Sequence, residues 1–242
     1  MSQVEPVGSP AVTPILELRD IRAGYGPIEV VHGISLHVTP GSVMALLGPN
    51  GGGKTTLLSV CAGTVPASAG EVFFEGAAVT STSADNRARL GICTVPEGRG
   101  IFPNLTVREN LLMATQVGVP MDHIEDVAFA QFPRLGERRR QMAGTLSGGE
   151  QQMLALARAF ATDPKLLLLD ELSMGLAPIV VGQLYDKVRE LAAAGLSILL
   201  VEQFARTALP IADRAAVVLQ GVIAHEGTPA EMEDALSSSY LG

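Results

Sequence analysis

Short, almost uninterrupted apolar runs recur along the chain and alternate with stretches of helical periodicity. The runs occupy residues 43–47, 92–95, 166–169, 198–201 and 215–219. A strand with one face in water alternates apolar and polar residues, whereas a strand of a parallel sheet covered on both faces is apolar throughout. The pattern therefore predicts an α/β fold built on a parallel sheet.

A second strand-rich pattern, punctuated by glycine and proline, lies at residues 15–18, 30–38 and 71–74. We expect these strands to form an antiparallel β subdomain that is joined to the edge of the parallel core. At the other end of the chain, Gln220 and Gly221 predict a hairpin turn between two strands. Thr228 and Glu231 then have the spacing of a capping box at the start of a last helix.

The sequence pattern between about residues 86 and 160 is helical, and we interpret this segment as an inserted helical subdomain. Within it, Thr106 and Glu109 have the spacing of a helical capping box. A basic run follows at Arg134 and residues 138–140, which we interpret as a solvated face. We expect one domain over residues 15–242, preceded by a flexible, proline-containing tail at residues 1–14.

The hydrophobic composition suggests a membrane-spanning protein, but the lengths of the apolar runs argue against one. The chain is 47% hydrophobic, with a mean hydropathy of +0.31. Its longest apolar runs are nevertheless only about five residues, and a spanning helix needs about 20. The 25 acidic residues exceed the 17 Lys and Arg, which disfavours a general nucleic-acid binder. The N-terminus does not have the pattern of a secretory signal, and the two cysteines and four histidines lack disulfide or zinc spacing, so we expect a reducing cytosol.

A complete phosphate-binding motif follows the first apolar run directly and precedes a helical run. A glycine-rich turn that only links strand to helix would not need the whole pattern, and here the G-x-x-x-x-G-K-[ST] motif is intact in its strand-to-helix context. Backbone N–H groups of such a loop and the helix N-terminus together bind phosphate. We expect Lys54 to reach the β- and γ-phosphates and Thr55 to ligate Mg²⁺. The candidate ATP-binding residues are Gly48, Pro49, Asn50, Gly51, Gly52, Gly53, Lys54, Thr55 and Thr56.

Two carboxylates, Asp170 and Glu171, end the apolar run KLLLLDE. Acids in this position are also found in ordinary solvated turns, but the phosphate loop upstream favours a catalytic role. In P-loop enzymes the strand-end Asp holds Mg²⁺ and a polar neighbour positions the attacking water. We therefore expect Asp170 to serve the metal and Glu171 to act as general base.

A second element with phosphate-binding character lies at TLSGGEQQ. Ser147, Gly148 and Gly149 precede a helix that we expect to begin near Glu150. The alternative is a simple capped helix start. One buried stripe is predicted along this helix, from the spacing of Met153, Leu156, Ala157 and Phe160.

These three motifs, in this order and with a helical insert between the first two, resemble the nucleotide-binding domain of ABC ATPases, a P-loop fold with a RecA-like core. The likeness covers residue 15 to the end. It implies a head-to-tail dimer that holds two ATP molecules, each between the phosphate loop of one subunit and the LSGGE signature of the other. The second subunit could be identical or different. The resemblance also implies that Tyr25 stacks on adenine, which we favour over the alternative of an ordinary turn tyrosine.

Four positions depart from the common pattern of that family. Glu97 replaces the usual Gln, where it would be a candidate Mg²⁺ ligand, and Gln203 replaces the usual switch His. Leu172 replaces a Pro and Ala177 an Asp. With PEGR, GLAP, VEQ and SYLG, the chain resembles LivF-type ATP-binding subunits of branched-chain amino-acid importers, whose sister subunit keeps Gln and His. Leu172 departs even from that group.

That resemblance implies an ATPase on the cytoplasmic face of the membrane, attached peripherally through permease subunits and served indirectly by a periplasmic or extracellular binding protein. Importers of urea or amides use similar ATPases, so the cargo stays open. A soluble ABC protein acting on ribosomes or DNA is a weaker alternative, because the chain has neither a second nucleotide domain nor a long coiled-coil insert. A regulatory module without catalysis is suggested only by Gln203.

Overall fold

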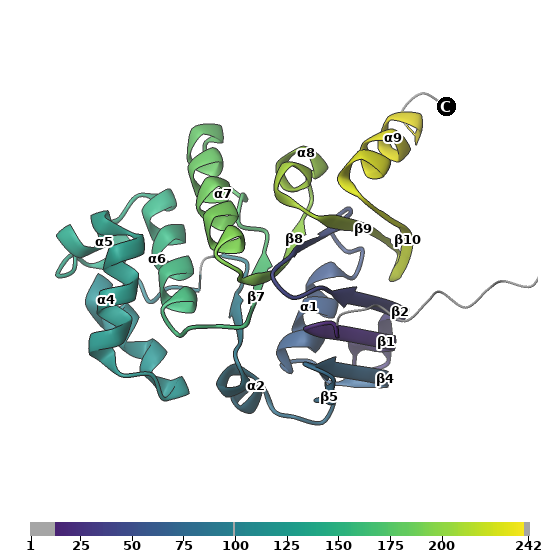
Figure 1. Ribbon diagram of the computed structural model, residues 1–242, viewed down its shortest axis with the longest axis horizontal. Coiled ribbons are helices and arrows are strands. Elements are labelled where there is room, and N and C mark those ends of the chain that lie inside the picture. Colours follow the sequence, from purple (N-terminus) through teal and green to yellow (C-terminus); the bar gives the residue numbers. More distant parts are fainter. Residues whose placement is uncertain (1–12, 99, 240–242) are drawn as a thin grey trace, which may run out of the picture.

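The structure, a computed structural model, describes residues 13–98 and 100–239 (Figure 1). Most of the predicted tail, residues 1–12, lies outside the described part, as do Arg99 of the PEGR motif and residues 240–242 of SYLG. Within the described residues, no helix combines the length and the apolar character needed to cross a bilayer.

A six-stranded sheet in the order β10-β9-β3-β8-β7-β6 forms the centre of the molecule. Its strands are β3 (Val43–Leu47), β6 (Ile92–Val95), β7 (Leu166–Asp170), β8 (Ser197–Glu202), β9 (Arg214–Leu219) and β10 (Val222–Gly227). The first five are parallel to their neighbours, and β10 is an antiparallel edge that pairs with β9. All five predicted apolar strands are therefore confirmed, and so is the hairpin, in which Gln220 and Gly221 both have positive φ.

The N-terminal strands form a sheet of their own, which confirms the expected antiparallel β subdomain. The strands are β1 (Leu16–Tyr25), β2 (Ile28–Val38), β4 (Ala67–Phe74) and β5 (Ala77–Ala78), in the antiparallel order β2-β1-β4-β5. A backbone hydrogen bond of 2.8 Å from His32 to Gly221 connects β2 with the β9–β10 turn. The two sheets thus meet through a turn.

Helices cover the central sheet and extend to one side of it (Figure 1). They are α1 (Lys54–Ala62), α2 (Ala84–Leu90), α3 (Val107–Leu112), α4 (Met121–Gln131), α5 (Pro133–Glu137), α6 (Gly148–Phe160), α7 (Pro178–Ala193), α8 (Ala205–Ala208) and α9 (Pro229–Ser239), with short 3₁₀ turns η1 (Met113–Val117), η2 (Ala143–Thr145) and η3 (Leu209–Ile211). The described residues between β6 and β7 form helices, turns and an isolated bridge between Thr106 and Met142, whereas α2 and β6 come before this segment. The boundaries of a helical subdomain near residues 86 and 160 stay a prediction.

Alternate residues of the central strands point into two separate cores. In β3, Met44 and Leu46 pack with α1 and the antiparallel sheet, while Ala45 and Leu47 pack with helices of the other face. The same division holds in β7, where Leu166 and Leu168 oppose Leu167 and Leu169. Each strand therefore has to be apolar on both faces, which is the physical origin of the uninterrupted runs.

Local signals within the helices are largely confirmed. Reciprocal capping boxes form between Thr106 and Glu109 and between Thr228 and Glu231. The buried surface of α6 is broader than the predicted stripe. Met153 and Phe160 are only half-buried, whereas Leu154, Ala155 and Ala159 are buried together with the predicted Leu156 and Ala157. The helix is enclosed on more than one side because the sheet, α3, α4 and α7 all contact it.

Arg87 is a buried cation that no sequence pattern singled out. Its guanidinium, 2% exposed, donates hydrogen bonds to five backbone carbonyls. The acceptors are Val60 and Cys61 at the C-terminal end of α1, and Val79, Thr80 and Thr82 in the segment before α2. A cation is favourable at a helix C-terminus, where carbonyl groups lack helical partners. Arg87 therefore joins the helix of the phosphate loop to the antiparallel side of the molecule.

Arg87→Met should lower the free energy of unfolding by about 3 to 5 kcal/mol, since it leaves several buried carbonyls without a donor. Chemical denaturation of the two proteins measures this difference. Arg89→Met is the matched control, because Arg89 lies two residues away on the same helix and is exposed. A control loss as large as that of Arg87→Met would contradict the structural role assigned to Arg87.

Candidate functional site

The phosphate loop runs between β3 and α1, in the strand-to-helix context that the motif requires. Gly48, with φ 143°, lies so close to β9 that an added Cβ would be 2.3 Å from the carbonyl oxygen of Val218. At Gly52 a Cβ would be 3.0 Å from both that oxygen and the carbonyl oxygen of Pro49. Only glycine allows the loop to curl this tightly against the sheet.

Lys54 begins α1 and is 3% exposed. Its Nζ donates to the carbonyl oxygens of Gly48 and Pro49, at 2.8 and 3.0 Å. The same atom lies 3.7 Å from Oε1 of Glu171. The cation is thus held over the loop, beside the strand-end carboxylate. No side chain caps the start of α1, since its N-cap is Gly53.

The strand-end acids lie at the same edge as this loop. The hydroxyl of Thr55 donates to Oδ1 of Asp170 over 3.2 Å, across 115 residues of chain. A cavity of about 260 Å³ is lined by Val30, Asn50, Gly51, Gly53, Lys54, Thr55, Thr56, Glu97 and Glu171. The structure therefore brings Glu97 and Glu171 to the phosphate loop, and it adds Val30 of β2, which the sequence did not single out.

The polar groups at this edge fit a hard divalent cation. Hydroxyl and carboxylate oxygens are the ligands that Mg²⁺ prefers, and it is usually held by one or two carboxylates together with phosphate oxygens. Thr55 and Asp170 are in direct contact here, and Glu97 lies at the same cavity. These residues fit the metal that the phosphate loop implies.

The pKa of Asp170 is raised to about 6, mainly by burial and also by the nearby charges of Glu171 and Glu97, while the hydrogen bond from Thr55 and the charge of Lys54 lower it. Asp170 is only 3% exposed, so its ionised form loses most of its hydration. A carboxylate under this constraint is stabilised by a bound cation.

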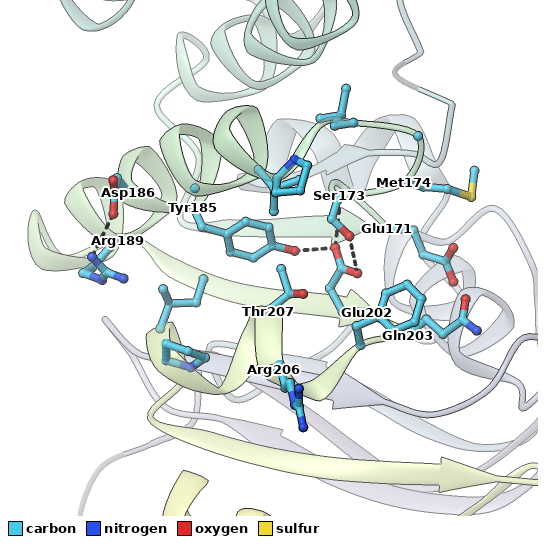
Figure 2. Close-up of a pocket in the computed structure, with 18 residues that line it drawn as sticks. Glu171, Ser173, Met174, Tyr185, Asp186, Arg189, Glu202, Gln203, Arg206 and Thr207 are labelled. Atoms are coloured by element: carbon cyan, nitrogen blue, oxygen red, sulfur yellow. Dashed lines mark hydrogen bonds and ion pairs between the residues drawn. The ribbon is translucent and has the colours of Figure 1, made fainter.

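Gln203 follows β8 and is exposed, outside the 260 Å³ cavity. It lines a second cavity, of about 590 Å³, which Glu171 also borders (Figure 2). The structure therefore places the two predicted catalytic residues beside one cavity, while only Glu171 also reaches the phosphate loop. Tyr25 ends β1, opposite Ile28, and is 54% exposed. It is not among the residues that line the phosphate cavity, so its stacking role stays a prediction.

The LSGGE element lies apart from the phosphate loop of the same chain. Ser147 caps α6, which begins at Gly148, two residues earlier than expected, and Ser147 forms a capping box with Glu150. Ser147, Gly149 and Glu150 border a different cavity, of about 330 Å³. An added Cβ at Gly149 would be 2.3 Å from a methyl carbon of Val180, so α6 and α7 require glycine for their close approach.

The four departures have distinct surroundings. Leu172 is fully buried in the core on the α6 and α7 side of the sheet. Ala177 is the N-cap of α7 and offers no side-chain hydrogen bond to that helix. Glu97 and Gln203 are described above. Sequence reasoning also missed Glu202, a buried acid that ends β8, although the signal that identified Asp170, a carboxylate closing an apolar strand, is present there too.

The raised pKa of Asp170 predicts a pH-dependent penalty on folding. Between pH about 4 and 6 the folded chain binds this proton and the unfolded chain does not, so the free energy of unfolding falls as the pH rises through this range. The penalty is therefore absent below pH about 4 and complete above pH about 6. Asp170→Asn should therefore raise the free energy of unfolding at pH 8 by about 2 kcal/mol, without nucleotide or Mg²⁺. The gain should vanish towards pH 4.

Urea denaturation at several pH values measures the gain. Asp186→Asn, which alters an exposed carboxylate paired with Arg189, is the control and should change the stability by less than about 0.5 kcal/mol at each pH. Equal stability of Asp170→Asn and the parent at pH 8 would contradict a buried, destabilised charge.

Known proteins resemble this chain over almost its whole length. The family model described as ABC transporter matches residues 31–173. The high-affinity branched-chain amino acid transport ATP-binding protein BraG of Pseudomonas aeruginosa is 41% identical over 236 residues, which cover 94% of this chain and 100% of that protein. The probable branched-chain amino acid transport ATP-binding protein LivF of Archaeoglobus fulgidus is 37% identical over 88% of this chain and 91% of its own. The lipopolysaccharide export system ATP-binding protein LptB of Escherichia coli is 34% identical, over 94% and 97%.

Solved structures give the same answer at the level of the fold. The ADP conformation of an ATP-binding cassette of an ABC transporter superposes with a TM-score of 0.83 at 29% identity, covering 93% of this chain and 95% of that one. A nucleotide-free cassette superposes with a TM-score of 0.82 at 28% identity and the same coverage. The fold is that of a P-loop ATPase. The chain belongs to the ABC transporter family, among its ATP-binding proteins.

Proposed function

We propose that this chain is the ATP-hydrolysing subunit of an importer for branched-chain or related hydrophobic amino acids. The observation that carries the ATPase part is the meeting of Lys54, Thr55, Asp170 and Glu171 at one edge of the central sheet. The cargo is inferred from the printed functions of the relatives in Pseudomonas and Archaeoglobus. An importer of urea or amides is the alternative cargo assignment.

Each residue has a distinct task in this proposal. The loop at residues 48–56 binds the phosphates through backbone N–H groups and the start of α1. Thr55 and Asp170 would hold Mg²⁺, with Glu97 at the same cavity, and the metal would supply positive charge that offsets the negative charge of the phosphates. Lys54, which now donates to two loop carbonyls, turns to the phosphate oxygens.

Glu171 accepts the proton of the attacking water as general base. Its carboxylate lies at the phosphate cavity and faces Lys54, so competition of phosphate oxygens for Lys54 frees it for this role. Gln203 donates a hydrogen bond to the γ-phosphate from the neighbouring strand, but it cannot become cationic as a histidine can. Tyr25 stacks on adenine from the end of β1.

The site is completed in this proposal by a second ATPase subunit, identical or different. Ser147, Gly148, Gly149 and Glu150 would contact the nucleotide of that partner. The support is geometric: the signature and the phosphate loop border separate cavities of one chain. Closure of the dimer on ATP would move permease subunits that attach the chain peripherally to the cytoplasmic face of the membrane. A binding protein outside would deliver the cargo.

Glu171→Gln should bind ATP no more weakly than the parent and lose about 100- to 1,000-fold in turnover, because the amide cannot accept the proton. Phosphate release by the assembled complex measures the turnover, and a nucleotide titration measures binding. Glu190→Gln, an exposed change on α7, is the control and should hydrolyse ATP like the parent. Turnover by Glu171→Gln at the parental rate would refute its role as base.

A groove beside the helical region offers a place for a permease segment. A cavity of about 400 Å³ lies between α2, β6, η1 and α6, with Phe102 and Met113 exposed at it. The guanidinium of Arg158 lies 5.5 Å from the Phe102 ring, and its buried Nη1 has no hydrogen-bond partner among the described residues. We infer that the occupant presents apolar side chains and an acceptor such as a carboxylate. Leu105 follows Phe102 by three residues in the sequence and is half-buried.

Phe102→Asp should reduce the amount of permease that copurifies with the chain by about tenfold, because a charge replaces an exposed aromatic side chain that the permease segment would cover. Val222→Asp, at an exposed apolar position on the far edge of the central sheet, is the control. Unchanged assembly of Phe102→Asp would reject the groove as the docking site. Identification of the copurifying binding protein and its ligand would separate the amino-acid cargo from urea or amides.

A further inference from the structure

A buried carboxylate that the proposed chemistry does not use lies directly before Gln203. Glu202 is the last residue of β8 and is 1% exposed. Its side chain lines the 590 Å³ cavity (Figure 2) and is not among the residues that line the 260 Å³ cavity at the phosphate loop. An isolated carboxylate is costly to bury, so its retention demands compensating hydrogen bonds.

Those hydrogen bonds come from two other elements. The backbone N–H and the hydroxyl of Ser173 donate to Oε1 and Oε2 of Glu202, at 3.1 and 2.9 Å. The phenol of Tyr185, on α7, donates to Oε1 as well. Burial and the adjacent carboxylate raise the pKa of Tyr185, so the phenol remains a donor throughout the physiological range. The acceptor role of Glu202 is thus matched by three donors.

The Ser173 contacts are the second of two attachments between the loop after β7 and the end of β8. The first is a 3.0 Å hydrogen bond from the backbone of Glu171 to the carbonyl oxygen of Val201. Glu171 itself has a φ of 45°, a left-handed conformation that is unfavourable for a residue with a Cβ. Such a conformation persists only where surrounding contacts over-determine it.

Two three-residue segments therefore lie side by side and are hydrogen-bonded at two points, from Glu171 to Val201 and from Ser173 to Glu202. One runs from Glu171 to Ser173 and the other from Val201 to Gln203. Glu171, the proposed base, stands on one segment, and Gln203, the proposed γ-phosphate contact, stands on the other, and both border the 590 Å³ cavity. A shift of either segment would change the distance between the two side chains.

The same carboxylate is bonded to the helix that packs against the signature element. Tyr185 lies on α7, one and a half turns after Val180, whose methyl carbon is in close contact with Gly149 of the LSGGE motif. Through Tyr185, Glu202 links the edge of the sheet that bears Glu171 to the helix against which α6 packs.

We propose that Glu202 is a positioning residue that holds the loop bearing Glu171 in register with Gln203. It contacts neither substrate nor metal and acts through Ser173 and Tyr185. This inference rests on the proposed ATPase function and adds to it a residue outside the phosphate loop and the Asp170–Glu171 pair. Its loss should misplace the base without weakening the phosphate loop.

The test combines Glu202→Gln, Ser173→Ala and the double variant, each in the full chain assembled with its permease. Gln offers an N–H₂ group where Glu offers a second acceptor, so it cannot receive all three donors. We expect kcat of Glu202→Gln to fall by about tenfold or more, with KM for MgATP within about twofold, since a small misplacement of a reacting group is costly. The double variant should be no slower than Glu202→Gln, because both changes remove one interaction.

Glu226→Gln, the same change in an acid paired with Arg214 on the edge strand, is the control and should keep the parental kcat. Additive losses in the double variant, or a rise in KM equal to the fall in kcat, would overturn the proposal. If Glu202→Gln does not fold, Ser173→Ala retains the carboxylate and must still lower kcat without changing KM.

Amide hydrogen exchange without ATP separates this inference from the ATPase proposal. In Glu202→Gln, exchange at Glu171 and Ser173 should accelerate by about tenfold, because both amides donate across the two segments, while the amides of α4 remain unchanged. Unchanged exchange at Glu171 and Ser173 overturns the positioning role whatever the turnover. Absence of ATPase activity in the parental complex would instead reject the proposed function and leave the exchange result decisive for Glu202.

Discussion

Burial of the central sheet on both faces is the constraint on which the rest of the structure depends. Parallel strands that are covered on both sides must be apolar along their length, so polar groups can only appear where the strands end. Four neighbouring strands, β3, β8, β7 and β6, end at the same edge. The phosphate loop, Asp170 with Glu171, Glu202 with Gln203, and Glu97 all follow those ends. The edge outside the carboxyl ends of an open α/β sheet is where ligands bind.

This concentration of acids has an energetic cost that the structure distributes unequally. Asp170 lacks full compensation, and its raised pKa records the deficit, which a divalent cation would relieve. Glu202, equally buried, is satisfied by donors within the chain. The two carboxylates illustrate the difference between a group prepared for a ligand and a group that fixes geometry. Arg87 also fixes geometry, in this case as a buried cation that donates hydrogen bonds to backbone carbonyls.

Much of the candidate site was accessible from sequence because each of its motifs is local. The phosphate loop, the strand-end pair and the capped LSGGE helix each occupy a few consecutive residues, so spacing alone identifies them. Val30 and Glu202 were missed for different reasons. Val30 reaches the site only because β2 folds against the loop. Glu202 ends an apolar strand as Asp170 does, but the interpretation of that strand end rested on the next residue, Gln203. The broader burial of α6 depends on how many elements enclose it.

The sequence by itself determined the α/β class, the five parallel strands, the hairpin and the capping boxes, because these follow from periodicity and from contacts within a few residues. Tertiary structure alone decided that the N-terminal strands pair in the order β2-β1-β4-β5, since strand pairing over long separations leaves no local pattern. It alone also decided that Thr55 meets Asp170 across 115 residues and that Arg87 binds five carbonyls. Hydrogen bonds of this kind depend on which backbone groups the packed sheets and helices leave without partners, and that is known only when the whole chain is folded.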